Sequence, residues 1–515
     1  MTRRRLPIGI QTFREVREED CYYVDKTPYI ARLLDEGKHY FLSRPRRFGK
    51  SLFLDTLKEL FEGTEELFTA LHIHDRWDWS ARHPVVRLDF AGGSFKDPGY
   101  LQTNLAAQLD GIEVASGVSP RYDTPPERFG YLIRSLHERS GQRVAVLVDE
   151  YDKPILDALE TPEIARANRD YLRGLYGVIK ARDAHVRFTF VTGVSKFSKV
   201  SLFSDLNNLT DITLDPAYSA ICGYTEGDLE TVFAPELAGL DRERVREWYN
   251  GYSWLGTEKV YNPYDVLLLL RRHKFAAHWF ETGTPAFLVE TLFKRRVSSV
   301  SLGQTVSTEA LLSVFDVDLI GTEALLFQTG YLTIIGEEDL GGETLYRLDY
   351  PNREVRQSLN RVLLRHLVQD AKRQTANSMR LARLLQAHDC AGLKELFHAF
   401  FASIPYQWYT NNQIAHYEGF YASVVYSYFA ALGYEIVVEE SSSHGRLDMA
   451  VRTGGHVYLF EFKVVEMAPP GSALAQLRER GYADKYRGRG EPVHLIGVEF
   501  SRETRNVTAF EVADG

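Results

Sequence analysis

"FLSRPRRFGKSL", residues 41–52, is the stretch that decides the fold of the first half of the chain. It ends in Gly49, Lys50 and Ser51, as a phosphate-binding loop of the pattern G-x-x-x-x-G-K-[ST] does where it runs into a helix. Such a loop holds phosphates with backbone N–H groups and a helix N-terminus, and Gly49 can take the positive φ that the turn needs. Arg44, however, stands where the first glycine belongs. The loop alone therefore fits a nucleotide site and a basic strand–helix loop equally well.

The residues around the loop predict the two elements that it must join. HYFLS (39–43) is typical of a short buried strand, and SLFLDTLKELFEG (51–63) has apolar residues at helical spacing and ends in glycine. Strands and helices alternate along the first part of the chain, which predicts an α/β fold with a mostly parallel sheet covered on both faces. The other strands are expected at 84–90, 143–152 and 186–195, and the other helices at 127–141 and 167–183.

A second motif favours the nucleotide interpretation. VAVLVDEYD (144–152) is a run of apolar strand residues that ends in Asp149 and Glu150, which is the form of a Walker B strand. Asp149 would hold Mg²⁺, through a water molecule, and Glu150 would orient or deprotonate the attacking water. The alternative is an ordinary core strand whose acids face solvent. Two such motifs in one chain make that alternative the weaker one.

The two motifs assign roles to the polar residues at the ends of their strands. Lys50 would reach the β and γ phosphates of ATP, Ser51 would bind the Mg²⁺, and Gly49 would allow the close approach of the loop. Thr192, in FVTGVS (190–195), ends a further strand and is suited to sense the γ-phosphate. A strand-end threonine without that role is equally common.

These segments resemble a known family. The resemblance is carried by LPIGIQTFREVREEDCYYVDKT (6–27), RPRRFGKS (44–51), VLVDEYDKP (146–154) and VTGVSKFSKVSLFSDLNNLTDIT (191–213). They are similar to segments of the AAA-ATPase-like proteins of bacteria, which have a degenerate phosphate loop of this form. The resemblance covers about residues 5–290 and implies that Asp25, Lys26 and Thr27 lie near the nucleotide. Arg46 and Arg47 either bind phosphate or guard an interface.

Two acids and a lysine mark the last part of the chain. Asp448 lies in a predicted strand at 446–453, and Glu461 and Lys463 lie in the next, at 456–465. Glu461 and Lys463 share a face because side chains alternate along a strand, and Asp448 can fall beside them in a hairpin. Two carboxylates can hold Mg²⁺ or Mn²⁺, which would activate water against a phosphodiester while the lysine steadies the developing charge. A surface Glu-x-Lys salt bridge would give the same pattern.

The order of these elements resembles the PD-(D/E)XK nuclease superfamily. The resemblance covers about residues 380–515, with GRLD (445–448) in place of a literal Pro-Asp. It implies that Asp448, Glu461 and Lys463 are the metal and catalytic positions. It also suggests Glu418 as an additional helix acid and Gln476 as the helix glutamine. Glu466, just past the second strand, is expected to be an exposed acid without a role.

Three domains are expected from the changes of pattern along the 515 residues, which exceed one ordinary core. We expect a P-loop AAA-ATPase-like domain at 1–225, a helical and winged-helix-like region at 226–375, and a restriction-endonuclease-like α/β domain at 380–515. The winged-helix expectation depends on 323–359, whose pattern is helix, strand, Gly-rich turn, strand and helix.

Composition limits the classes of function. With 61 basic and 70 acidic residues the net charge is −9, so nucleic acid would have to meet a local basic patch. Three separated cysteines without a CxxC pair predict a reducing compartment and no zinc ribbon. No signal-peptide pattern and no bilayer-length apolar run occur, so we expect a cytoplasmic protein with no membrane partner. The candidate basic residues beside the nuclease motif are Arg478, Arg480, Lys485, Arg487 and Arg489.

These patterns predict a bacterial protein that binds and hydrolyses ATP and couples this to a metal-dependent nuclease. The expected cofactors are ATP and Mg²⁺, with Mn²⁺ as a second metal for the nuclease site. Nucleic acid is the expected partner, with DNA favoured over RNA, and a homo-oligomer is left open. The rival hypothesis is a nucleotide-dependent switch that binds nucleic acid or protein without cutting.

Overall fold

The computed structural model describes residues 3–196, 206, 208–279, 288, 291–292, 295, 302, 305–313, 321–368, 370–402, 418–442, 445–487 and 490–515. The described residues form two compact units, one from 3–288 and 305–352 and the other mainly from 353–515. Within these residues, no helix is both long and apolar enough to cross a bilayer. Each unit is described by itself below.

The first unit is built on a five-stranded sheet in which every neighbouring pair of strands is parallel, as expected from the sequence. The strand order is β2-β3-β4-β1-β5. Because all strands run the same way, their carboxyl ends meet at one edge of the sheet, where ligands of open α/β sheets bind. The strands are β1 (His39–Ser43), β2 (Val85–Asp89), β3 (Val144–Asp149), β4 (Val186–Gly193) and β5 (Thr210–Asp211).

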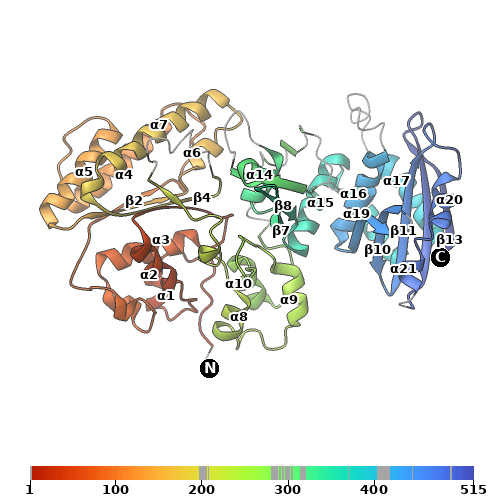
Figure 1. Ribbon diagram of the computed structural model, residues 1–515, viewed down its shortest axis with the longest axis horizontal. Coiled ribbons are helices and arrows are strands. Elements are labelled where there is room, and N and C mark those ends of the chain that lie inside the picture. Colours follow the sequence, from red (N-terminus) through yellow and green to blue (C-terminus); the bar gives the residue numbers. More distant parts are fainter. Residues whose placement is uncertain are drawn as a thin grey trace. The chain divides into compact units, whose positions relative to one another are not determined.

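Helices cover both faces of this sheet (Figure 1). One face carries α1 (Phe13–Glu18), α2 (Thr27–Glu36) and α3 (Lys50–Glu62). The other carries α4 (Tyr100–Ser116), α5 (Pro125–Ser140), α6 (Lys153–Leu156) and α7 (Pro162–Ala181). Because helices cover both faces, every residue of β1 and β3 is buried, instead of every second one. Helix α4 was not expected from the sequence.

The region that follows is helical, and then forms a small antiparallel sheet. The helices are α8 (Glu226–Val232), α9 (Arg242–Tyr249) and α10 (Pro263–Arg272), each capped at its N-terminus by a side chain, from Thr225, Asp241 and Asn262 respectively. The sheet has the order β6-β8-β7, with β6 (Thr305–Thr308), β7 (Thr333–Leu340) and β8 (Glu343–Asp349). Helices α13 (Glu309–Ser313) and α14 (Thr322–Gln328) precede the β7–β8 hairpin. The predicted order of helix, strand, turn, strand and helix is therefore confirmed, and β6 adds a strand that was not predicted.

The second unit contains a mixed five-stranded sheet of order β13-β12-β11-β10-β9. Strands β11 and β12 are parallel, and the other pairs are antiparallel. The strands are β9 (Glu435–Ser442), β10 (Gly445–Thr453), β11 (His456–Val464), β12 (Val493–Ser501) and β13 (Asn506–Asp514). The helices are α15 (Arg353–Val368), α16 (Ala371–Gln386), α17 (Cys390–Ala402), α19 (Glu418–Leu432), α20 (Ser472–Glu479) and α21 (Asp484–Arg487).

The alternation of side chains along β11 separates the two cores of this unit. Phe460 and Phe462 pack in the larger core with residues of α15, α16, α17 and α19. Val457 and Leu459 pack in the smaller core with residues of α20 and α21. Strand β13 closes the sheet and was not predicted from the sequence.

We expect the second unit to fold by itself if the chain is cut before α15. Leu364 and Val368 of α15 and Leu381 of α16 are buried in its larger core, and full burial of one such side chain stabilises a fold by about 1.5–3 kcal/mol. A fragment of residues 353–515 should therefore unfold cooperatively, and a fragment of residues 380–515 should melt at a lower temperature. Thermal unfolding followed by circular dichroism compares them. Equal melting temperatures would contradict this expectation and favour the sequence-based boundary near 380.

Candidate functional site

The phosphate-type loop joins β1 to α3 at the carboxyl edge of the parallel sheet. Gly49 has φ 93°, and no atom lies within 4 Å of where its Cβ would be, so the glycine is required by the backbone and not by space. Lys50 is buried, and its Nζ donates to the carbonyl oxygens of Arg44 at 3.0 Å and Pro45 at 3.1 Å. The Lys50 side chain therefore spans the loop and binds two of the loop's own carbonyl oxygens.

Arg44 stands at the position of the first glycine. In this conformation its side chain is buried and supports the loop instead of binding phosphate. Its guanidinium donates to the carbonyl oxygens of Thr213 at 2.8 Å and Tyr218 at 3.2 Å, and it lies 4.2 Å from the ring centre of Trp254. Burial lowers the pKa of Arg44 to about 10. The positive φ angles of the loop fall instead at Arg47, with 70°, and at Gly49. The first position therefore has no need of glycine.

The acidic strand brings its two carboxylates to the same edge of the sheet. Asp149 ends β3 and is 1% exposed, and the nearby Ser51 hydroxyl of α3 acts to lower the pKa of its carboxyl group. Burial raises the pKa of Asp149 to about 6, and the charge of Glu150 adds to the rise. A hydroxyl beside a carboxylate is the kind of hard-oxygen donor set that Mg²⁺ binds, so these residues fit the ion.

Glu150 has an unusual backbone conformation. Its φ is 52°, in the left-handed region that residues other than glycine seldom adopt, and its N–H donates to Oδ1 of Asp149 at 3.0 Å. Such conformations cluster at functional sites because the surrounding fold has to enforce them. Glu150 is half-buried and lies directly after the buried aspartate.

Thr192 lies between the two motifs because β4 separates β1 from β3. It is fully buried, and its hydroxyl donates to the carbonyl oxygen of Leu42 at 2.9 Å. In this conformation the hydroxyl therefore supports the strand before the loop. Its role as a γ-phosphate sensor stays a prediction.

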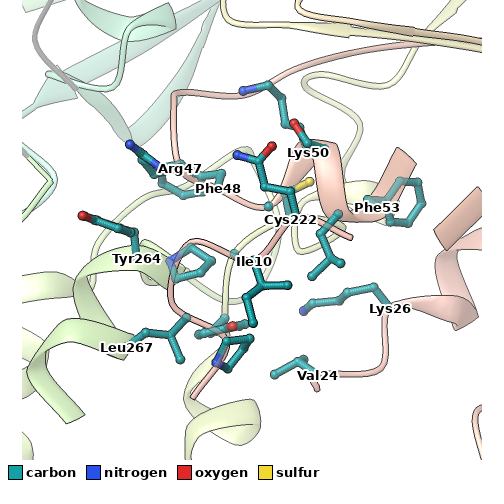
Figure 2. A pocket seen from close by; sticks show the side chains of 18 of the residues that line it. Ile10, Val24, Lys26, Arg47, Phe48, Lys50, Phe53, Cys222, Tyr264 and Leu267 are labelled. Atoms are coloured by element: carbon teal, nitrogen blue, oxygen red, sulfur yellow. The ribbon is translucent and has the colours of Figure 1, made fainter. Parts of the chain in front are cut away.

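A pocket of about 130 Å³ opens beside the loop and is shown in Figure 2. Arg47 and Tyr264 lie on one side of it and Phe53 on the other, with Ile10 between them. The Arg47 guanidinium lies 4.8 Å from the ring centre of Tyr264. The lining is mostly aromatic and aliphatic and includes the loop residues Phe48, Gly49, Lys50 and Ser51.

The N-terminal segment and the helical region also reach this site. Of the three residues expected near the nucleotide, Lys26 lines the pocket and pairs with Asp228 at 2.9 Å. Asp25 and Thr27 accept hydrogen bonds from the backbone N–H groups of residues 72 and 73 instead.

Sequence reasoning gave no role to three residues that hold the loop from the helical side. The indole of Trp279 donates to the carbonyl oxygen of Arg46 at 3.1 Å, and the Asn262 amide approaches the same oxygen at 3.5 Å. Trp254 covers Arg44. Each lies more than 200 residues after the loop, in a segment rich in aromatic residues, so no local pattern connected it with the loop.

The acids at the C-terminal end of the chain meet on one face of the mixed sheet. The pairing of Met449 with Phe460 sets Asp448 and Glu461 opposite one another on β10 and β11. Asp448 Oδ2 accepts from the backbone N–H of Phe462 at 2.8 Å. Glu461 is fully buried, and its Oε1 accepts from Lys463 Nζ at 2.9 Å.

Helix α20 completes this cluster. The Gln476 amide donates to Oε1 of Glu461, the same oxygen that Lys463 contacts. Burial, and then the charge of Glu461, raises the pKa of Tyr482, while the Gln476 side chain acts in the opposite direction. Glu418 is the first residue of α19, and its side chain lies outside the described residues. Among the side chains that the structure describes, no group of three or more His, Cys, Asp or Glu is arranged to hold a metal ion.

The expected exposure of Glu466 is confirmed, whereas its silence in metal binding and cleavage stays a prediction. The residue is exposed, but its Oε1 accepts from the Ser501 hydroxyl at 2.8 Å and from the Arg502 N–H at 3.0 Å. It therefore holds the turn between β12 and β13. The sequence near Glu466 did not indicate these contacts, because the partners lie 35 and 36 residues further along the chain.

Comparison with known protein families finds two domains in this chain. The model of the family described as "Predicted AAA-ATPase" matches residues 7–203, and that of the PD-(D/E)XK nuclease superfamily matches residues 416–510. No solved structure matches the chain. A protein of Azotobacter chroococcum mcd 1 named "Uncharacterized protein in vnfD 5'region" is 60% identical over 99% of both chains. The chain therefore belongs to the family of this Azotobacter protein, with an AAA-ATPase-like domain followed by a PD-(D/E)XK nuclease superfamily domain.

Proposed function

We propose that this protein binds and hydrolyses ATP at the first site and cuts nucleic acid at the second, with the nucleotide state controlling the cut. The observation that carries the proposal is the meeting of Lys50, Ser51 and Asp149 at one edge of the parallel sheet, where the Ser51 hydroxyl lies near the buried carboxylate. A basic loop without a nucleotide would not need a buried aspartate beside its serine, because burial of a carboxylate is costly.

At the first site, each group has a separate task. The N–H groups at the start of α3 would hold the phosphates. Lys50 would exchange the loop carbonyls for the β and γ phosphates. The apolar pocket that contains Phe53 and Tyr264 is suited to a flat base, and Glu150 would orient the attacking water. Mg²⁺ held by Ser51 and Asp149 would supply charge neutralisation on the phosphates.

At the second site, the cluster of Asp448, Glu461 and Lys463 supports phosphodiester hydrolysis. The two carboxylates would hold Mg²⁺ or Mn²⁺, which supplies Lewis acidity to the scissile phosphate. Lys463 would leave Glu461 when the ion arrives and would then face the reacting phosphate with its charge. Gln476 would keep the Glu461 carboxylate oriented, because it donates to the same oxygen.

The cellular setting completes the proposal. A cytoplasmic location fits the three cysteines, which are all free thiols. DNA is favoured over RNA as the substrate, and the exposed Arg478, Arg480 and Lys485 would contact its backbone. Assembly into a homo-oligomer is a further element of the proposal.

A specific observation supports the rival function, in which the second domain binds without cutting. Glu461 is already held by Lys463 and Gln476, so its carboxylate is balanced without a metal ion. The decisive experiment is incubation of the protein with single- and double-stranded DNA and RNA, with Mg²⁺ or Mn²⁺, and with or without ATP. Binding without cleavage under every condition would favour the switch.

The first prediction concerns the charges at the nucleotide site. Lys50→Ala should weaken ATP binding roughly 10- to 100-fold, because a charge-assisted hydrogen bond contributes about 1.5–3 kcal/mol. Glu150→Gln should bind ATP as the wild type does but hydrolyse it slowly. Calorimetry and a phosphate-release assay measure the two effects, with Lys58→Ala, further along α3, as the control. Hydrolysis at the wild-type rate in Glu150→Gln would exclude Glu150 as the water-orienting group.

A second prediction uses the backbone of Glu150. The left-handed conformation costs a residue other than glycine about 1–2 kcal/mol. Glu150→Gly should therefore keep or raise the thermal stability while hydrolysis is lost. Glu150→Ala removes the same carboxylate but keeps the strain, and it should melt at a lower temperature than Glu150→Gly. The reverse order of melting temperatures would argue against strain at this position.

The nuclease site gives the third prediction. Asp448→Asn should lose metal binding and cleavage, yet it keeps an acceptor for the Phe462 N–H. Lys463→Ala should keep the metal and lose cleavage by about 10²–10³-fold, as expected for the removal of a group that stabilises transition-state charge. Glu479→Gln, an exposed acid on α20, is the control in place of Glu466. Metal titration by calorimetry is run beside a cleavage assay, and wild-type metal affinity in Asp448→Asn would rule the site out.

A further inference from the structure

A cation on the strand next to the acidic strand faces the buried Asp149. Strand β2 pairs with β3 in parallel, and Asp89 lies directly across from Asp149. Arg87, two residues earlier on the same face of β2, reaches toward both carboxylates. Its Nη2 lies 3.6 Å from Asp89 Oδ2 and 3.7 Å from Asp149 Oδ2. The pattern at 84–90 predicted only a strand, and Arg87 was not among the candidate site residues.

The same arginine is anchored on the helix that begins with the phosphate-type loop. Arg87 Nη1 donates to Asp55 Oδ1 at 2.8 Å. Asp55 is in turn fixed, because its Oδ2 accepts from the buried N–H of Phe13 at 2.7 Å. Asp55 comes four residues after Ser51 on α3, so the two side chains lie on the same face of the helix. The guanidinium therefore links α3 to the ends of β2 and β3.

The distances separate two kinds of contact. The 2.8 Å bond to Asp55 is a hydrogen bond, whereas 3.7 Å to Asp149 exceeds hydrogen-bond range and is an ion-pair contact. Arg87 thus attracts the Asp149 carboxylate without filling its lone pairs. The Glu150 N–H donates a hydrogen bond to Oδ1 of that carboxylate, and the Ser51 hydroxyl lies near it.

Three negative groups surround this guanidinium. Asp55 has a side chain that is 8% exposed, Asp149 one that is 1% exposed, and Asp89 is partly open to solvent. Buried carboxylates close together repel one another unless a cation lies between them. A guanidinium has two terminal nitrogens, so one arginine can hold two carboxylates in fixed positions, whereas a lysine ammonium cannot.

We propose that Arg87 is a positioning residue that holds the Asp149 carboxylate in the orientation in which it receives the magnesium ion of the bound nucleotide. The inference depends on the proposed ATP site and adds a residue to it. Without the fork, the carboxylate would be free to turn toward other donors. Residues that orient a metal ligand in this way typically contribute roughly 10- to 100-fold in metal affinity.

The test separates nucleotide binding from the magnesium requirement in the full-length protein. ATP affinity is measured by calorimetry in EDTA, and the magnesium concentration that gives half of the added affinity is then found by titration. Arg87→Met should keep the wild-type affinity in EDTA and need roughly 10- to 100-fold more magnesium. Arg87→Lys keeps the positive charge but not the forked guanidinium, so its magnesium requirement should lie between those of the wild type and of Arg87→Met. Arg143→Met, an exposed arginine directly before β3, is the matched control and should behave as wild type.

The outcomes distinguish this inference from the proposed function. A wild-type magnesium requirement in Arg87→Met would overturn the positioning role. So would an equal loss of affinity with and without magnesium, since that is the mark of a purely structural residue. If Arg87→Met fails to fold, Arg87→Lys decides, and a wild-type requirement there would overturn the role of the fork. If the wild type binds no ATP under any condition, the proposed function fails as well.

Discussion

The parallel pairing of β1, β4, β3 and β2 is the constraint on which the first site depends. Parallel strands bring all their carboxyl ends to one edge, so residues from four separate segments meet there. Lys50 and Ser51 follow β1, Asp149 ends β3, Thr192 lies near the end of β4, and Asp89 ends β2. A shift of one residue in the register of β2, β3 or β4 would turn Asp89, Asp149 or Thr192 to the opposite face of the sheet.

The loop at that edge is stabilised from outside. Buried Arg44 donates to backbone carbonyls of the segment around 213–218 and packs on Trp254. A glycine at this position would leave the loop locally flexible, whereas the arginine connects it to distant segments of the chain. Trp279 and Asn262 hold the backbone of the same loop through the Arg46 carbonyl. A movement of the loop on ligand binding would therefore act, through these contacts, on the helical region that follows the ATPase-like sheet.

The second site relies on a different arrangement to bring its charges together. The β10–β11 hairpin sets Asp448 beside Glu461, and α20 adds Gln476 from the same side. Phe460 and Phe462, on the other face of β11, are buried in the larger core, so the strand that carries Glu461 and Lys463 is rigidly held. In both sites a carboxylate is buried and balanced by hydroxyl, amide or cationic donors, which is how a buried charge is made tolerable.

The sequence by itself determined the elements and the motifs that end them. Short apolar runs predicted the strands at 39–43 and 143–152, and strands separated by Gly-containing turns predicted the hairpin at 446–465, because such patterns are local properties of each segment. The sequence also identified Lys50, Asp149, Asp448 and Glu461 as candidates. Helix α4 and strand β13 were not predicted, and the apolar residues of α4 show only a weak helical periodicity.

Only the tertiary structure decided what the charged residues contact. The contacts of Arg44, Arg87 and Glu466 were not visible in the sequence, because their hydrogen-bond partners Thr213, Asp55 and Ser501 lie 169, 32 and 35 residues away. Local patterns follow from the backbone geometry of one segment, whereas such contacts follow from the order in which strands pair and the depth at which helices pack. Arg44 illustrates the difference: in the sequence it is a missing glycine, and in the fold it is a buried cation whose hydrogen bonds join the loop to the segment beyond β5.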